Sequence, residues 1–177
     1  MSALKQIRLA IGLVIAGLVF SGVTAFPLLH ELRLLSFVMT GEARANPDLH
    51  EGLLHWILTV REGLEVTHER YPFLAYGTDW LAFGHLVIAL FFILPWREPA
   101  RYQGVLRVGV VASFAVIPLA LICGPIRGIP FGWRMIDCSF GLLCLPPLLF
   151  ALRKIRELQS ITPWEWGASD GEPPRAQ

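Results

Sequence analysis

This chain has little charge. Charged residues make up 16% of its 177 positions, whereas hydrophobic residues make up 54%, and a soluble domain carries about 25% charged residues. The net charge is only +1, and no dense cluster of lysine and arginine occurs, which argues against a nucleic-acid-binding protein. With a mean hydropathy of +0.55, the long apolar runs place the chain among integral membrane proteins.

Cysteine is also scarce. The three residues, Cys123, Cys138 and Cys144, form no CxxC pair and no zinc-ligand spacing. All three lie in or beside apolar runs, where a free cysteine behaves as a small hydrophobic residue. Cys123 and Cys138 flank one short loop, so a disulfide between them stays open if that loop faces an oxidising compartment.

Four apolar runs approach the ~20 residues that cross a bilayer. They cover residues 9–29, 80–95, 105–123 and 135–152. The sequence therefore predicts an all-α fold, in which residues 1–161 form one membrane domain with a bundle of four transmembrane helices. Residues 162–177 have the composition of a disordered cytoplasmic tail. The second and fourth runs are short for a core of ~30 Å, which indicates a locally thinned or protein-covered position.

The first apolar run has features of a secretory signal peptide. Lys5 and Arg8 precede it, and the segment VTA at 23–25 resembles a small-residue cleavage site. The run continues past this segment to Leu29, which favours an uncleaved anchor.

Positive charges predict the orientation of the four spans. They precede the first span, separate the second from the third, and follow the fourth. The clusters are Lys5 and Arg8; Arg97, Arg101 and Arg107; and Arg153, Lys154 and Arg156. All three lie on one side of a four-span protein, so both termini are expected in the cytoplasm. Segment 30–79 and loop 124–134 then face outward.

The outward segment contains a predicted amphipathic helix at residues 47–70. Asn46 suits its N-cap, Pro47 suits its first position, and Pro72 limits its end. On a helical wheel at 100° per residue, the acidic side chains and one histidine lie on one face. Leu58 lies on the same face and interrupts it. The members of this face are Glu51, His55, Glu62, Glu65 and Glu69, opposite an apolar side formed by Leu49, Leu53, Trp56, Val60 and Leu64.

Three interpretations of this acidic face stay open: a solvated surface, a metal site and a partner surface. Glu65 and His68 form a Glu-x-x-His pair, a spacing that di-iron carboxylate bundles use twice. Only one copy occurs here, and His68 points about 60° away from Glu65 on the helical wheel. The candidate metal ligands are Glu65, His68, Glu62, His55 and Glu51.

Besides Arg107 at the start of the third span, the predicted spans contain one histidine and one carboxylate. His85 and Asp137 are each expected at shallow depth below the outer surface, at about 9 Å and about 6 Å along their helices. A charge in a span is costly and usually faces the bundle interior with a partner. Such a pair can handle protons, bind a metal, or ligate a quinone or haem edge. Haem held by two histidines is disfavoured, because the spans contain no second histidine.

A purely structural role is the alternative for the same residues. Asp137 would then pair with Arg134 or Arg127, and His85 would bond to a helix carbonyl. Thr78 or Asp79 can cap the second span's helix, and Arg127 can bind a carboxylate or a lipid phosphate. The candidate ligand or partner residues are His85, Asp137, Asp79, Arg127 and Arg134.

The segments TDWLAFGHLVIA at 78–89 and GPIRGIPFGWRMIDCSFG at 124–141 resemble those of uncharacterised bacterial multi-pass membrane proteins of about this size. The resemblance covers the second to fourth spans. It implies a location in the bacterial inner membrane and implies no activity.

The sequence favours a membrane protein that binds a polar ligand or partner at its extracytoplasmic face, as a subunit of a larger complex or as a homo-oligomer. One alternative is a membrane-embedded enzyme that depends on a metal or on acid/base chemistry. Another is a small transporter or channel lined by spans that Pro118, Pro146 and Pro147 kink. No cofactor and no catalytic residue can be named.

Overall fold

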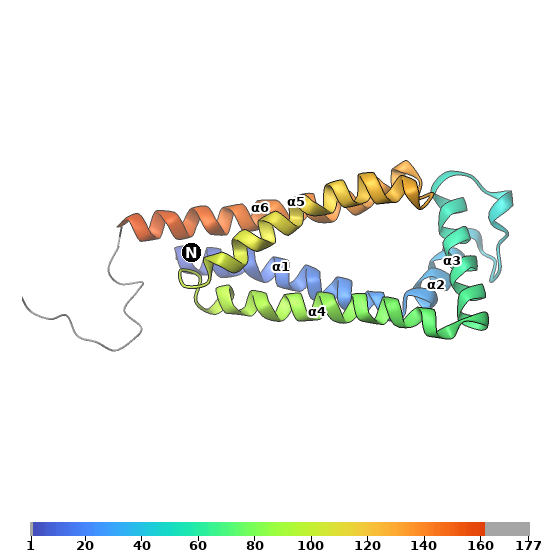
Figure 1. The fold of residues 1–177 in the computed structure, drawn as a ribbon, viewed down its shortest axis with the longest axis horizontal. Helices are drawn as coiled ribbons and strands as arrows, with labels where there is room; N and C mark the ends of the chain where they lie inside the picture. Colours follow the sequence, from blue (N-terminus) through green and yellow to red (C-terminus); the bar gives the residue numbers. More distant parts are fainter. Residues whose placement is uncertain (1, 162–177) are drawn as a thin grey trace, which may run out of the picture.

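A computed structural model describes residues 2–161, and within this range the chain is helical with no strand (Figure 1). The predicted tail at 162–177 lies outside the described residues. The α-helices are α1 (Ala3–Ala25), α2 (Leu28–Thr40), α3 (Gly52–Arg70), α4 (Tyr76–Arg97), α5 (Gln103–Ile126) and α6 (Phe131–Ile161), with short 3₁₀ helices η1 (Pro47–Leu49) and η2 (Pro72–Ala75).

Four helices, α1, α4, α5 and α6, are long and apolar enough to cross a membrane, which confirms the predicted multi-pass organisation. They are longer than their apolar runs. Helix α4 has 22 residues and α6 has 31, and at 1.5 Å per residue these span about 33 Å and about 46 Å. Both helices are therefore long enough to cross a core of ~30 Å, although the apolar runs within them are shorter. The helical hydrogen bonds continue beyond the apolar residues into polar segments. In α6, for example, Arg153 and Lys154 pair with Glu157.

The first span also differs from its prediction. Helix α1 begins at Ala3, where the Ser2 hydroxyl accepts a hydrogen bond from the N–H of Lys5, and it ends at Ala25. Pro27 has no backbone N–H and stands at the N-cap of α2. Leu28 and Leu29, which were expected in the span, are therefore the first residues of α2.

The spanning helices pack as two pairs, α1 with α4 and α5 with α6, and α1 also contacts α6. The pairs meet in an apolar core near the chain's N-terminus and the α4–α5 turn (Figure 1). This core comprises Ile7, Ala10, Ile11 and Val14 of α1, Phe92 of α4, Leu106 of α5, and Leu148, Ala151 and Ile155 of α6. At the other end of the bundle the two pairs separate, and α3 stands across the gap.

Glycines allow close approach within and between the pairs. In α1, a Cβ on Gly22 would lie 2.9 Å from the Ala82 carbonyl oxygen of α4. In α5, a Cβ on Gly109 would lie 2.7 Å from Cζ of Phe92, and Gly141 of α6 lies directly against the Ser113 carbonyl. Each pair is therefore packed along its length, whereas contact between α4 and α5 is concentrated where Phe92 meets Gly109.

The expected loop 124–134 is much shorter in the structure, because α5 continues to Ile126 and α6 begins at Phe131. The turn is closed by backbone hydrogen bonds from Gly128 to Pro125 and from Ile129 to Gly124, with Gly128 at φ +71°. Cys123, Cys138 and Cys144 are free thiols, so the disulfide that the sequence left open is not formed.

Residues 28–75, here called the end cap, lie across the open end of the bundle (Figure 1). The predicted helix 47–70 is interrupted in its first turns. Asn46 caps only η1, where its Oδ1 accepts from the N–H of Asp48 at 2.9 Å. His50 and Glu51 are extended, and Gly52 begins α3 at φ +63°, a conformation that favours glycine. The predicted end at Arg70, before Pro72, is confirmed.

We expect Gly141→Ala to lower the melting temperature of the detergent-purified protein. The new methyl group would meet the Ser113 carbonyl, which is backbone and cannot turn away, and overpacking typically costs about 1–3 kcal/mol. Gly17→Ala in α1 is the matched control, because nothing lies within 4 Å of its new Cβ. Equal melting temperatures for the two variants would refute the close α5–α6 contact.

Candidate functional site

The candidate ligand residues all belong to the open end of the bundle. Asp79 and His85 lie in the first half of α4, whereas Arg134 and Asp137 lie in the first turns of α6. Arg127 is in the turn that joins α5 to α6. From the observed helix starts, His85 is about 13 Å and Asp137 about 9 Å along its helix, because both helices begin earlier than the sequence indicated.

His85 and Asp137 continue the faces of their helices that form the apolar core. Residues about two helical turns apart share a face. In α4, the core residue Phe92 lies about two turns after His85. In α6, the core residue Ala151 lies about four turns after Asp137. In α1, the core residue Val14 lies about two turns before Ser21, on the same face. The three inward faces therefore change from apolar to polar toward the end cap.

Burial changes along the same three faces. Val14, Phe92 and Ala151 are buried, whereas Ser21, His85 and Asp137 are only partly buried. Hereafter Ser21, His85 and Asp137 are called the polar site. All three belong to the parts of their helices nearer the end cap, and the two helix pairs separate toward that end (Figure 1).

The two ionisable groups of the polar site differ in their partners. Nδ1 of His85 lies 2.9 Å from the Leu81 carbonyl oxygen of its own helix, as the structural alternative predicts, and Nε2 has no partner within residues 2–161. Asp137 makes neither a hydrogen bond nor an ion pair with any described residue. Its predicted pairing with Arg134 or Arg127 is therefore not formed.

The two arginines are held in other ways. The aliphatic part of Arg134 packs against Gly124 of α5, and its guanidinium lies 5.3 Å from the centroid of the Phe131 ring. Its Nε is buried without a partner. Arg127 is exposed in the turn. The mouth of the bundle thus carries two cations, while the carboxylate of Asp137 lies one turn further in.

The predicted cap of α4 is wrong. The helix begins at Tyr76, and the Thr78 hydroxyl donates to the Ala75 carbonyl at 2.6 Å instead of accepting an N–H. Asp79 lies in the first turn, where its charge complements the helix dipole, and it makes no hydrogen bond or ion pair with the rest of the described chain.

The candidate metal ligands do not converge. Glu65 pairs with Arg33 of α2 at 2.7 Å, and Nδ1 of His55 lies 2.9 Å from the Pro47 carbonyl oxygen. Glu51, Glu62 and His68 are exposed. No group of three His, Cys, Asp or Glu side chains within residues 2–161 is placed to hold a metal ion.

The buried face of α3 is also not the predicted apolar side. Ile57, Leu58 and Arg61 are buried, whereas Leu49 is 78% exposed and Leu53 is 49% exposed. Helix α3 packs on α2, and this contact selects a face between the acidic and apolar sides of the wheel.

Sequence reasoning missed Arg61, whose side chain is only 3% exposed. Its Nη2 donates to the Ala45 carbonyl at 2.9 Å, and its Nε and Nη1 are buried without a partner. No carboxylate of the described chain pairs with it. The available signal was its spacing of three and four residues from Leu58 and Ile57, which places it on their face.

We expect Arg61→Met to raise the melting temperature by the equivalent of about 1–4 kcal/mol, because hydrophobic replacement of buried charges is often stabilising by this amount. Methionine retains much of the packing volume and removes an unpaired guanidinium. Thermal unfolding in detergent measures the change. A lower melting temperature for Arg61→Met would mean that the guanidinium has a compensating partner.

Comparison of the chain with known protein families, with curated proteins and with solved structures gives no match. A functional assignment therefore rests on the arrangement of the polar residues.

Proposed function

We propose that this protein is a multi-pass protein of the bacterial inner membrane that binds a polar ligand, or a polar segment of a partner protein, at its extracytoplasmic end. One observation carries the proposal. The inward faces of α1, α4 and α6 carry Ser21, His85 and Asp137 in the parts of these helices nearer the end cap, and the two helix pairs separate toward that end (Figure 1).

The distribution of positive charge supports this orientation. Arg8 of α1 lies at the core end of the bundle, where its guanidinium donates to the carbonyls of Trp96 and Arg97, both at 3.1 Å. Lys154 and Arg156 follow the spanning part of α6 toward the same end. This basic end would be cytoplasmic, and the end cap would then face outward.

The chemistry of the polar site favours a ligand that carries hydrogen-bond donors. An ionised Asp137 can only accept hydrogen bonds, and an unpaired carboxylate in a span is costly. Nε2 of His85 can serve as a further acceptor while Nδ1 donates to the Leu81 carbonyl. An ammonium, guanidinium or hydroxyl group could donate to either residue.

Binding is better supported than transport or catalysis. Beyond the polar site the bundle interior is closed by apolar side chains of all four spans, including Ile11, Phe92 and Leu148. A transported polar solute would have to cross this apolar core. A metal-dependent enzyme would need ligands that converge, and the described residues hold no such group.

Cysteine accessibility tests the proposed site in intact bacterial cells. In a chain with Cys123→Ser, Cys138→Ala and Cys144→Ala, we expect Asp137→Cys to react with a membrane-impermeant thiol reagent added from outside. Met135→Cys is the matched control. It is two residues closer to the start of α6, about 3 Å, but on the opposite, lipid-exposed face, so it should react much more slowly.

Either of two results would overturn the proposal. Reaction of Asp137→Cys only after the cells are opened would mean that the polar site faces the cytoplasm. Equal protection of Asp137→Cys and Met135→Cys would mean that the inward face of α6 is sealed.

We also expect Asp137→Asn to keep or raise the melting temperature, because the change removes a charge that has no ion-pair partner among the described residues. Thermal unfolding of purified protein measures this. A marked loss of stability in Asp137→Asn, with Asp79→Asn unchanged, would indicate that Asp137 is structurally paired.

A further inference from the structure

Helix α2 exposes several large apolar side chains and directs the charged side chain of Arg33 toward its neighbour α3, which is the reverse of a helix on the surface of a soluble protein. Arg33 pairs with Glu65 of α3 at 2.7 Å and Ser36 is fully buried, whereas His30 and Glu31 of the first turn are exposed. Leu34, Phe37 and Val38 are 64%, 52% and 71% exposed. These three lie within about 100° on the helical wheel and form an apolar face over the later turns of α2, beyond His30 and Glu31 of the first turn.

The Arg33–Glu65 pair and the burial of Leu32 and Ser36 orient α2 against α3, and the remaining polar contacts of α2 lie within the helix and at its ends. The Ser36 hydroxyl donates to the Leu32 carbonyl, and the Thr40 hydroxyl donates to the Ser36 carbonyl at 2.8 Å. At the helix end, Gly41 adopts φ +73° and its N–H bonds to the Phe37 carbonyl. Turning the apolar face inward would break the Arg33–Glu65 pair and expose Leu32.

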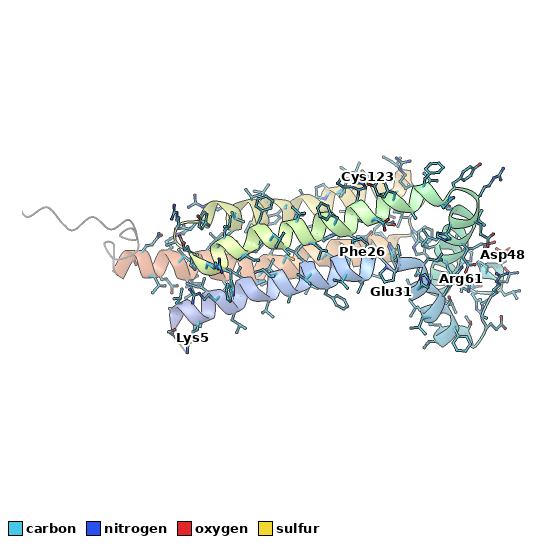
Figure 2. The ribbon with its side chains drawn as sticks, turned by 90° about the horizontal axis from the view of Figure 1, so that it is seen from below. Lys5, Phe26, Glu31, Asp48, Arg61 and Cys123 are labelled. Atoms are coloured by element: carbon cyan, nitrogen blue, oxygen red, sulfur yellow. The ribbon has the colours of Figure 1, made fainter. Side chains whose placement is uncertain are left out.

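The position of α2 indicates what covers its apolar face. Only Phe26 and Pro27 separate it from α1, so α2 begins at the membrane boundary. It turns away from the axis of α1 and projects beyond the side of the bundle, as Figure 2 shows past Phe26 and Glu31. Phe20 and Val23, in the last turns of α1, are also strongly exposed. The lipid-facing surface of the span therefore leads directly to α2.

We propose that α2 is an interfacial helix that inserts Leu34, Phe37 and Val38 into the adjacent lipid leaflet. The partner is the boundary between headgroups and acyl chains, where an amphipathic helix lies in the plane of the membrane with its apolar face down. The end cap would thus be anchored by lipid through α2 and by protein through the Arg33–Glu65 pair. This inference is independent of which side of the membrane the end cap occupies.

Spin-label accessibility in phosphatidylcholine nanodiscs tests the proposal. The label is placed by Val38→Cys in the full chain with Cys123→Ser, Cys138→Ala and Cys144→Ala. Collisions with oxygen report lipid, and collisions with a water-soluble nickel chelate report water. We expect an oxygen-to-nickel ratio close to that of Ile122→Cys on the exposed surface of span α5, and several-fold above that of Glu62→Cys on exposed α3.

Two outcomes would overturn the inference. Nickel access at Val38 equal to that at Glu62 would mean that the apolar face of α2 is in water. Low access to both reagents would mean that a second copy or another protein covers it. Leu34→Cys provides a second label on the same face if Val38→Cys fails to fold. Since the polar site lies in α1, α4 and α6, either failure would leave the Asp137 accessibility result unaffected.

Discussion

The two helix pairs of this molecule are joined at one end, where α1 packs on α6 and Phe92 of α4 meets Gly109 of α5. A side chain at Gly109 would collide with the Phe92 ring, so the absence of a Cβ lets α4 and α5 meet at the apolar core. Within each pair, glycines sustain close packing much further: Gly22 against α4, and Gly141 against α5. The bundle is therefore two firm helix pairs joined mainly at one end. Their separation at the other end (Figure 1) is what leaves room for polar side chains on inward faces.

The end cap is held by polar contacts that a soluble hairpin would place outside. Arg33 pairs with Glu65 between α2 and α3, and the Arg61 guanidinium bonds to Ala45 from a buried position. In water such an arrangement is wasteful, because it leaves apolar surface exposed and a charge desolvated. Beside a bilayer the cost of the apolar surface disappears, since lipid covers it. The proposed lipid contact of α2 would therefore account for its exposed apolar face.

The spans and the end of α3 could be predicted from the sequence because each has a local cause. A run of apolar residues needs no partner to be recognised, and Pro72 limits the helix before it whatever surrounds it. The buried face of α3 could not be predicted in this way. The wheel placed Leu49 and Leu53 on the apolar side of the helix. In the structure, the pairing of Arg33 with Glu65 turns a different face of α3 toward α2, and Arg61 is buried on it. Which side of an amphipathic helix is buried depends on the element that packs against it. That element is set by the tertiary structure and cannot be read from the helix alone.

The same distinction applies to the polar site. The sequence could identify His85 and Asp137 as costly residues in spans, because burial of a charge is unfavourable in any fold. It could not show that Asp137 lacks an arginine partner, since Arg134 is close in sequence but its side chain is turned onto Gly124 and Phe131. The short α5–α6 turn fixes this choice by bringing Gly124 directly against Arg134. Packing of one arginine on a glycine therefore leaves a carboxylate available at the open end of the bundle, and that availability favours binding over a purely structural role.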